Sequence, residues 1–324
     1  MGGTELLAAT LESRLDAELG SRFQIIPSRL RGIDPARIPI YWLHDLPEGK
    51  ESQHLANGGW KRFRKLVYVS NWQAQLYQRH FGIPWDAGQV LLNAIEPIAA
   101  LPRSRDTLRI IYHSTPHRGL EILVPVFERL CQRYSNIELD VFSSFKLYGQ
   151  EEQDEPYRDL FERCKAHPKI RYHGTQSNAA VREALGRAHL FAYPSIWPET
   201  SCLCLMEAMS AGCLCVHSNF GALYETAANW TMMYHYHDQP QKHADLLHAQ
   251  LAQAVESYWS EGVQTALAQQ KAYADRFYSW DARIPQWGNL LRDLLAERTV
   301  FAPQLSISFR LGADTQSWPT SGTK

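Results

Sequence analysis

The segment from Tyr193 to Gly212 constrains this chain more than any other. It reads Tyr-Pro-Ser-Ile-Trp-Pro-Glu-Thr-Ser-Cys-Leu-Cys-Leu-Met-Glu-Ala-Met-Ser-Ala-Gly. A short apolar strand is expected to end at its start, and its final glycine favours the end of a helix. Its two carboxylates, Glu199 and Glu207, lie on either side of the predicted helix start. Acids in such a position suit the hydroxyls of a sugar nucleotide rather than the backbone of a nucleic acid.

Strands and helices alternate through the C-terminal two-thirds of the chain. Short apolar or alternating runs predict strands over 108–112, 137–142, 170–173, 190–193 and 214–217. Apolar residues at helical spacing and capping residues predict helices over 119–134, 156–166, 179–187 and 201–211. Pro125 is expected to kink or interrupt the first of these helices. Repeated units of this length imply a mostly parallel α/β sheet with helices on both faces.

The first hundred residues alternate less regularly. We expect helices over 4–19 and 72–81, and strands over 23–26, 39–43, 66–69 and 89–92. Two prolines mark 96–106 as an interdomain linker. The predicted divisions are an N-terminal domain over 1–100, a C-terminal domain over 104–278, a helix over 281–298 and a loose tail over 301–324.

Composition excludes several classes of protein. The chain has 324 residues, of which 45% are hydrophobic and 21% charged, and its net charge is −1, so two ordinary globular domains are expected. A nucleic-acid-binding protein would show a strong basic excess. No apolar run approaches the roughly 18 residues that span a bilayer, and Met1–Glu5 does not resemble a signal peptide. We expect a cytoplasmic protein, with peripheral membrane association left open.

A metal site is not expected. The six cysteines include the pairs Cys202/Cys204 and Cys213/Cys215, whereas structural zinc usually binds cysteines two to four residues apart. Small apolar packing is the simpler interpretation of these residues. His235 and His237 alternate on an expected strand, but no third ligand stands at a sensible spacing.

The pattern around Glu199 and Glu207 resembles the Glu-x7-Glu signature of the retaining glycosyltransferases of family 4, the group 1 transferases with the GT-B fold. The resemblance is strong over 106–228 and thin over 1–95. It implies two Rossmann-like, doubly wound domains that face each other across a cleft, with the last helix crossing back to the N-terminal domain. The N-terminal domain would be on the acceptor side, and the C-terminal domain would bind the nucleotide sugar. Gly2-Gly3 resembles the loop that follows the first strand of the family, so the N-terminal domain is expected to be shortened.

The resemblance also implies roles for residues of the C-terminal domain. Glu207 would bind the ribose hydroxyls of a donor nucleotide, and Glu199 would lie close to the transferred sugar. The residues at the helix start would turn their backbone amides toward the sugar or diphosphate, and these are Thr200, Ser201, Cys202 and Leu203. The segment from His217 to Glu225 resembles the Gly-Gly-x-Pro-Glu loop of the family, in which Gly221 would allow the donor to approach the backbone. The alternative for Glu225 is a structural role, in which it caps or braces the next helix.

A cation for the leaving diphosphate is expected after the strand 108–112. Arg118-Gly119 opens the following helix, and an arginine binds phosphate with bidentate geometry. By resemblance, Arg118 takes the place of a lysine of the family and His113 takes the place of an arginine. His44, at the end of another strand, resembles the histidine of the family that faces the donor sugar from the N-terminal domain.

The activity implied is transfer of a sugar from a UDP- or GDP-sugar to a hydroxyl of a glycan or lipid-linked saccharide, with retention at the anomeric carbon and without a metal or other cofactor. Arg118, Glu199 and His44 would be catalytic. Two alternatives remain: a non-catalytic or partner-dependent sugar-nucleotide-binding protein, and a phosphorylase or epimerase on the same fold. A dinucleotide oxidoreductase is disfavoured because no Gly-x-Gly-x-x-Gly follows a strand. The basic and aromatic run Trp60–Lys65 could touch an anionic membrane or a lipid-linked acceptor.

Overall fold

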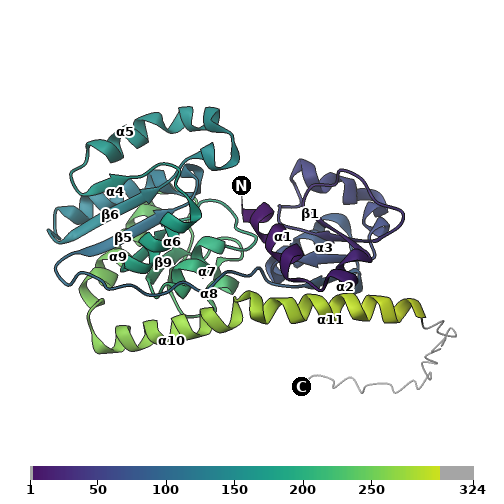
Figure 1. Ribbon diagram of the computed structural model, residues 1–324. Helices are drawn as coiled ribbons and strands as arrows, with labels where there is room; N and C mark the ends of the chain where they lie inside the picture. Colours follow the sequence, from purple (N-terminus) through teal and green to yellow (C-terminus); the bar gives the residue numbers. More distant parts are fainter. Residues whose placement is uncertain (1–2, 300–324) are drawn as a thin grey trace, which may run out of the picture.

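Two parallel sheets organise the computed structural model, which describes residues 3–299. Each sheet belongs to its own α/β domain, and the two domains lie side by side with a long helix, α11 (Trp280–Thr299), running beneath the N-terminal one (Figure 1). The architecture is that of a GT-B protein, as expected. The predicted tail 301–324 and Gly2 lie outside the described residues.

The N-terminal sheet has four parallel strands in sequential order. They are β1 (Phe23–Pro27), β2 (Ile38–Trp42), β3 (Lys65–Tyr68) and β4 (Gly88–Val90). The single helix predicted over 4–19 is wrong: α1 (Gly3–Arg14) stops, and Asp16 accepts a hydrogen bond from the backbone of Leu19 to begin α2 (Ala17–Ser21). An aspartate side chain at a helix start favours this break over a continuous helix. Gly3 therefore opens a helix rather than forming part of a loop.

The C-terminal sheet has six parallel strands in the order β10-β9-β8-β5-β6-β7. They are β5 (Leu108–His113), β6 (Ile137–Phe142), β7 (Ile170–Tyr172), β8 (Leu190–Tyr193), β9 (Leu214–Ser218) and β10 (Met232–Tyr234). The first five agree with the predicted strands to within a residue. β10 ends at Tyr234, so the strand expected to carry His235 and His237 does not extend to them.

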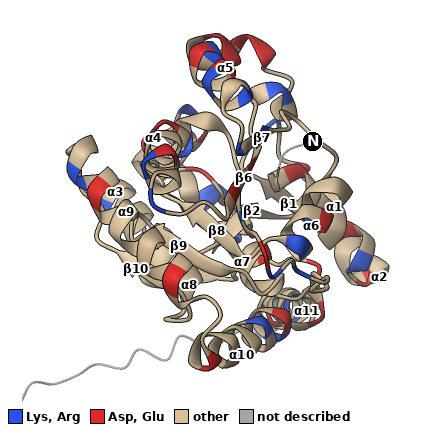
Figure 2. Ribbon diagram, turned by 90° about the vertical axis from the view of Figure 1, so that its left-hand side faces the viewer, with Lys and Arg blue, Asp and Glu red and all other residues tan. Residues whose placement is uncertain are grey.

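Helices cover both faces of the C-terminal sheet. α4 (Leu120–Cys131) packs against α9 (Pro240–Ser257), while α7 (Leu203–Ser210) packs against α10 (Glu261–Phe277) and α6 (Asn178–Arg187). Figure 2 shows α4 and α9 on one side of the strands and α6 and α7 on the other. Pro125 does not interrupt α4, contrary to expectation. It lies on the exposed face, where water can take the hydrogen bond that the helix loses.

The strand order places a switch point between β5 and β8. The chain leaves β5 toward β6 and β7 on one side, and it leaves β8 toward β9 and β10 on the other. Ile110 pairs with Leu190 and Ile111 with Phe191, so the carboxyl ends of both strands meet at one edge of the sheet. In open α/β sheets, ligands bind in the crevice outside such a point.

The last helix belongs to the core of the N-terminal domain although it follows the C-terminal domain in sequence. Trp287 of α11 is fully buried and meets Trp42 of β2 edge-on, with ring centroids 5.1 Å apart. Leu290, Leu291 and Leu294 pack in the same cluster. Leu7 and Leu11 of α1 belong to this cluster too, so α11 and α1 together bury the apolar side chains of the N-terminal sheet on this face.

The linker between the domains is tied to the C-terminal domain. Arg103 donates to the carbonyl oxygens of Ala211 (2.6 Å) and Gly212 (2.9 Å) at the end of α7. Lys271 of α10 donates to the carbonyl oxygens of Ile98 and Ser210, each at 2.6 Å. These cations satisfy carbonyl groups that a helix end leaves without partners.

Glu225 joins the two domains directly. It lies in α8 (Leu223–Ala227), and its carboxylate accepts hydrogen bonds from the backbone N–H groups of Asn71 (2.8 Å) and Trp72 (2.5 Å). These groups form the N-terminus of α3 (Asn71–Phe81) in the N-terminal domain. Glu225 was expected to brace the next helix in the sequence, and that expectation is wrong. The helix that it contacts is α3, which precedes it by about 150 residues and is brought to it only by the folding of the chain. A carboxylate at a helix N-terminus is stabilised by the free N–H groups and by the helix dipole.

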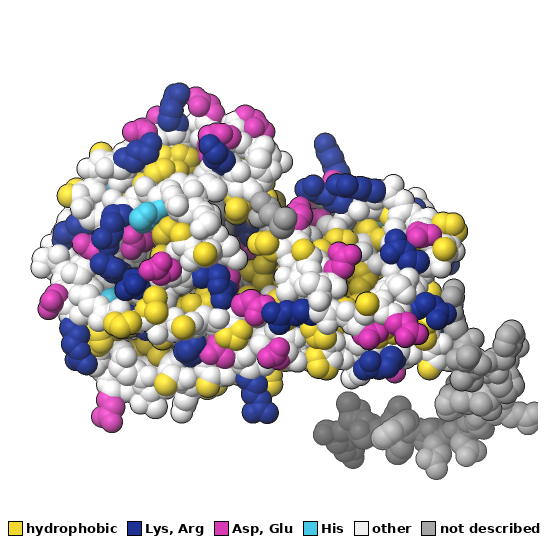
Figure 3. All heavy atoms as spheres, viewed as in Figure 1, with side chains coloured by type: hydrophobic (Ala, Val, Ile, Leu, Met, Phe, Trp, Pro, Cys, Tyr) yellow, Lys and Arg dark blue, Asp and Glu magenta, His cyan; other side chains and the backbone are white. Residues whose placement is uncertain are grey.

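Lys and Arg side chains are interspersed with Asp and Glu on the face drawn in Figure 3, so this face has no large patch of one charge. The same view shows a notch between the two domains. Within residues 3–299, no helix combines the length and the apolar character that a membrane crossing requires.

We predict that Glu225→Ala loosens the contact between the domains, because α3 loses its carboxylate partner. The free energy of unfolding should fall by about 1–2 kcal/mol in urea titrations, and the radius of gyration from small-angle X-ray scattering should rise. Glu261→Ala is the matched control, since Glu261 is an exposed acid in the first turn of α10, a helix of the C-terminal domain. An unchanged radius of gyration in Glu225→Ala would show that other contacts hold the domains closed.

Candidate active site

An ion pair occupies the switch point. Arg118 Nη1 lies 2.5 Å from Glu199 Oε1, which brings together residues that follow β5 and β8. Glu199 is 4% exposed. The tyrosine that ends β8, Tyr193, donates its hydroxyl to the same Oε1 at 2.7 Å. The sequence pattern indicates Arg118 and Glu199 separately, and the fold makes them partners.

The burial of this pair determines its charge state. Burial would lower the pKa of Arg118, but Glu199 and Tyr193 beside it hold that pKa well above its usual value. Burial raises the pKa of the Tyr193 phenol well above its usual value, and the Glu199 charge adds to the effect. The arginine therefore stays cationic and the phenol stays protonated, so the pair offers a fixed positive charge beside a hydrogen-bonded carboxylate.

Two glycines allow the site to close up around this pair. Gly119 has φ 106°, and a Cβ atom there would lie 2.1 Å from the Pro194 carbonyl oxygen. Gly221 has φ 66°, and a Cβ atom there would lie 2.5 Å from the backbone N and O of Glu199. The Glu199 carbonyl also accepts from the Ala222 N–H at 2.7 Å. Gly221 thus permits close approach of the protein's own backbone, which holds Glu199 in place.

Glu207 forms a second pair, with a residue that sequence analysis missed. Arg182 of α6 donates from Nη1 to Glu207 Oε1 at 3.2 Å. Its Nη2 donates to the carbonyl oxygens of Glu96 and Pro97 in the linker, each at 2.9 Å. Burial raises the pKa of Glu207, while His113 and Arg182 oppose that rise. Arg182 therefore joins the Glu207 carboxylate to the linker between the domains.

His113 lies beside Glu207 at the end of β5 and is 7% exposed. Burial alone would lower its pKa, but Cys204 and Glu207 outweigh burial and raise it. The Cys204 thiol donates to the His113 carbonyl at 3.0 Å, and Cys202 occupies the N-cap position of α7. A histidine that gains positive charge here provides a second cation at the same edge of the sheet.

His44 faces this edge from the N-terminal domain. Its carbonyl accepts from the Thr200 hydroxyl at 2.7 Å, a hydrogen bond between the domains. Burial lowers the pKa of His44 to about 3, so its ring is neutral at physiological pH. Leu203, at the start of α7, packs against the cores of both domains.

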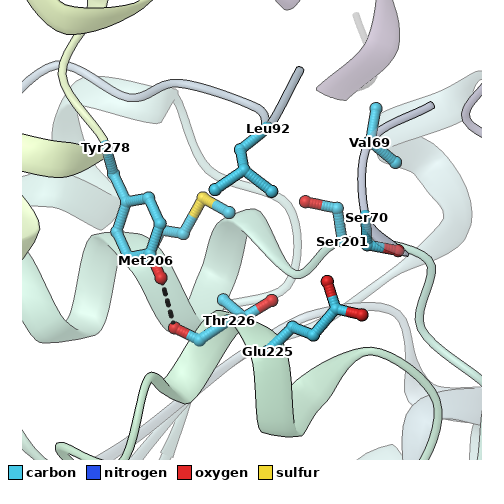
Figure 4. Close-up of a pocket in the computed structure, with 8 residues that line it drawn as sticks. All are labelled: Val69, Ser70, Leu92, Ser201, Met206, Glu225, Thr226 and Tyr278. Atoms are coloured by element: carbon cyan, nitrogen blue, oxygen red, sulfur yellow. Dashed lines mark hydrogen bonds between the residues drawn. The ribbon is translucent and has the colours of Figure 1, made fainter. Parts of the chain in front are cut away.

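A small cavity of ≈ 10 Å³, enough for about one water molecule, lies in this seam. Figure 4 shows Met206 on one side of it and Ser70 and Ser201 together on the other, with the Glu225 carboxylate turned toward Ser70. Tyr278 donates to the Thr226 carbonyl at 2.7 Å along the same wall. The cavity lies between residues of the two domains and has no room for a larger ligand.

Several buried polar atoms around the ion pair lack a hydrogen-bond partner within residues 3–299. They are His44 Nε2, His113 Nε2, Thr115 Oγ1, His117 Nδ1, Arg118 Nε, Ser143 Oγ and Ser201 Oγ. Buried polar groups are normally satisfied, so such a concentration at one edge of a sheet indicates a polar ligand. Cationic Arg118 and the free donors suit an anion, and the carboxylates suit hydroxyls.

In the described part of the chain, no group of three or more His, Cys, Asp and Glu residues is arranged to hold a metal ion. The six cysteines form no disulfide bonds. Cys202, Cys213 and Cys215 are buried in the apolar core of the C-terminal domain.

The model of the family described as glycosyl transferases group 1 matches residues 99–269, slightly more than half of the chain. The chain belongs to the group 1 glycosyl transferases. The match covers the switch point, the Arg118–Glu199 pair and Glu207. No curated protein sequence matches this group 1 transferase significantly.

Solved structures share its fold at low sequence identity. A glycosyltransferase from Rickettsia africae superposes with a TM-score of 0.64 at 15% identity, covering 90% of this chain and 80% of that one. The pneumococcal O-GlcNAc transferase GtfA in complex with UDP and GlcNAc gives 0.63 at 12% identity, over 91% and 60%. The sucrose-phosphate synthase of Thermosynechococcus elongatus gives 0.61 at 16%, over 81% and 69%.

The fold brings the predicted residues to one edge of the cleft, but it pairs them in ways that the sequence pattern does not indicate. Arg118 and Glu199 touch, Glu207 and His113 lie together, and His44 reaches the group through its backbone. Tyr193 and Arg182 were missed. Tyr193 stood inside the recognised segment, whereas no local signal could have found Arg182.

We predict that Arg118→Gln destabilises the group 1 transferase by about 2–3 kcal/mol, because it leaves Glu199 buried without its cation. The double variant Arg118→Gln/Glu199→Gln should lose less than Arg118→Gln alone. Urea unfolding of wild type, both single variants and the double variant gives the coupling energy. Additive losses would mean that the two side chains do not depend on each other.

Glu207 should oppose stability above its ordinary pKa of 4.5, because its pKa is raised in the folded protein. Such a group favours folding below pH 4.5 and loses that contribution as pH rises through the folded pKa. Urea titrations at pH 4.5 and 7.5 measure the free energy of unfolding of wild type and of Glu207→Gln. We expect the value of the variant, relative to that of wild type, to be higher at pH 7.5 than at pH 4.5. A constant difference between the two proteins would contradict the raised pKa.

Proposed function

We propose that the protein transfers a sugar from a UDP- or GDP-sugar to a hydroxyl acceptor, with retention at the anomeric carbon. One observation carries the proposal: the buried Arg118–Glu199 pair lies at the switch point of the sheet, with further unpartnered donors around it. This arrangement suits a molecule that carries both a diphosphate and a ring of hydroxyls. Family membership supports the same reaction class, and the UDP and GlcNAc bound to GtfA support the donor class by analogy.

Arg118 would stabilise the leaving diphosphate. Only Nη1 of its guanidinium bonds to Glu199, and Nε has no partner in residues 3–299, so donors remain for a phosphate oxygen. Burial opposes protonation of His113, but Cys204 and Glu207 raise its pKa, and His113 in its protonated form would add positive charge on the side of Glu207. Fixed charges in a site that excludes water act most strongly where negative charge develops during the reaction. The proposed reaction uses these cations in place of a bound metal.

Carboxylates would hold the hydroxyls of the donor. Glu207 binds Arg182 through Oε1, which leaves Oε2 for the ribose. Glu199 binds Arg118 and Tyr193 through Oε1, which leaves Oε2 for the transferred sugar. The backbone amides of Thr200, Ser201, Cys202 and Leu203 would face the sugar or diphosphate, and neutral His44 would accept or donate one hydrogen bond from the opposite domain.

The chemical step would be a displacement on one face of the sugar. The bond between the anomeric carbon and the phosphate oxygen breaks, and a bond from the same carbon to the acceptor oxygen forms. The departing phosphate takes the proton of the acceptor hydroxyl, so no protein nucleophile is needed. The acceptor would be a glycan or lipid-linked saccharide used in polysaccharide synthesis, and we place the enzyme in the cytoplasm with peripheral access to a membrane.

A nucleotide panel tests this proposal. Calorimetry with UDP and GDP, and release of nucleoside diphosphate from UDP- and GDP-sugars, should give binding and slow hydrolysis in wild type. Glu207→Ala should weaken nucleotide binding about 10- to 100-fold, since a hydrogen bond to a charged group contributes about 1.5–3 kcal/mol. Glu162→Ala, an exposed acid on α5 (Arg158–Ala166), is the control. EDTA should leave hydrolysis unchanged.

Other outcomes would identify a different protein. Nucleotide binding without turnover, even with saccharides present, would indicate a non-catalytic sugar-nucleotide-binding protein. Release of sugar phosphate from a glycan and inorganic phosphate would indicate a phosphorylase. Equal nucleotide binding by wild type and Glu207→Ala would remove Glu207 from the site.

A further inference from the structure

Arg118 and Glu199 meet through one hydrogen bond, although their side chains have the shapes to form two. Nη1 of Arg118 lies 2.5 Å from Oε1 of Glu199, while Nε of Arg118 is buried and has no partner within residues 3–299. An arginine and a carboxylate frequently form two parallel N–H···O bonds, because the planar guanidinium matches the two carboxylate oxygens. The unused Nε would gain a hydrogen bond in such a bidentate pair, so another group must oppose it.

The opposing group is the phenol of Tyr193. It donates to Oε1 of Glu199 at 2.7 Å, so Tyr193 and Arg118 share one oxygen and neither binds Oε2. Binding Nε as well would require the carboxylate to turn until Oε1 and Oε2 both face the guanidinium. That turn would carry Oε1 away from Tyr193 and leave a fully buried phenol without an acceptor, which is costly in the protein interior.

The Tyr193 ring cannot follow the carboxylate. Tyr193 is the last residue of β8, where it pairs with His217 of β9. Its ring stacks on Phe191, with centroids 5.5 Å apart and 18° between the planes, and lies 6.0 Å from the ring of Tyr112. The three aromatic side chains are fully buried. The sheet and its core therefore fix the position of the phenol.

The main chain of Glu199 is fixed as well. Its carbonyl oxygen accepts from the Ala222 N–H at 2.7 Å, and it pairs with Gly221, where a Cβ atom would not fit. Only the side-chain torsions of Glu199 remain to choose between the two arrangements. Tyr193 and Nε of Arg118 therefore compete for the orientation of one carboxylate, and in the structure Tyr193 prevails.

Pairing through a single bond keeps polar groups of the site free. Oε2 of Glu199 remains an acceptor for a hydroxyl, and Nε of Arg118 remains a donor for a phosphate oxygen. A bidentate pair would engage both groups at once. Donors stabilise the charge that develops on a leaving diphosphate only if they are not already bound elsewhere.

We propose that Tyr193 is a positioning residue: its phenol keeps the Arg118–Glu199 pair joined by a single hydrogen bond, so that Oε2 of Glu199 and Nε of Arg118 stay available to the donor sugar nucleotide. The identity of that ligand rests on the proposed function, whereas the geometry of the pair does not. Removal of the phenol should let the pair close into the bidentate form, in which these groups no longer reach the ligand.

A double-variant cycle tests this role through the hydrolysis of UDP-glucose, UDP-GlcNAc or GDP-mannose, whichever the wild type hydrolyses fastest. The four proteins are wild type, Tyr193→Phe, Arg118→Lys and the variant with both changes. Lysine keeps the positive charge but cannot form the bidentate pair. Tyr193→Phe should therefore lower kcat at least about tenfold when residue 118 is arginine, and less than about twofold when it is lysine. A general loosening of the fold would lower kcat equally in both backgrounds, and that result would overturn the inference.

The form of the pair is also measurable without substrate. Nitrogen–proton correlation NMR spectra resolve arginine Nε–H groups, and the signal of Arg118 is the one that Arg118→Lys removes. A hydrogen bond from Nε to the carboxylate in Tyr193→Phe should move this signal downfield and slow its exchange with water. Tyr112→Phe is the matched control, because Tyr112 is equally buried but donates to the Thr115 carbonyl, at 2.8 Å. The dispersion of the other signals shows whether each variant is folded.

The two measurements separate this inference from the proposed function. Absence of nucleotide-sugar binding and hydrolysis in wild type overturns the proposed function, and the Arg118 signal still decides the role of Tyr193. An Arg118 signal that is the same in wild type and Tyr193→Phe overturns the inference, even if nucleotide sugars are hydrolysed. A signal that moves equally in Tyr193→Phe and Tyr112→Phe overturns it too, because the change would then report altered packing rather than a turned carboxylate.

Discussion

Parallel strands β5 and β8 are neighbours whose chains leave in opposite directions, and the ion pair of Arg118 and Glu199 stands where they part. Taking two charges out of water is expensive unless they meet with good geometry and their remaining hydrogen bonds are made. Tyr193 helps to satisfy the carboxylate, and the main chain at Gly221 holds it in place. The unpartnered polar atoms around the pair cost the folded state free energy because their hydrogen bonds are not made. The same atoms are available to bind a ligand.

The contact between the domains depends on the same region. The segment after β8 carries Glu199 toward the pair, Thr200 to the backbone of His44, and Leu203 into the cores of both domains. Glu225 then reaches the N-terminus of α3. The contacts between the domains therefore arise from the same edge of the sheet that holds the Arg118–Glu199 pair.

Local patterns predicted most of the elements because strand and helix signals depend on neighbouring residues. β6 and β8 have the predicted bounds, and α6 begins within a residue of the predicted start, with Ser177 as its cap. The failures occurred where one residue changed a longer pattern. Asp16 divided a helix by satisfying its own backbone neighbour, and Pro125 was tolerated because the exposed side of α4 lets water replace the lost bond. The first outcome depends on a side-chain hydrogen bond and the second on solvent access, and periodicity reports neither.

The sequence by itself determined the fold class and the types of residue at the candidate site, since Glu199, Glu207 and Arg118 follow strands in a recognisable pattern. Only the tertiary structure decided the partners of those residues. Arg182 meets Glu207 from another helix, Glu225 meets α3 from another domain, and His117 meets Phe145 and Trp197 from separate loops. The physical reason is that charge and aromatic contacts act over a few ångströms in space, and residues distant in the chain reach that separation only after the sheet has set the strand order.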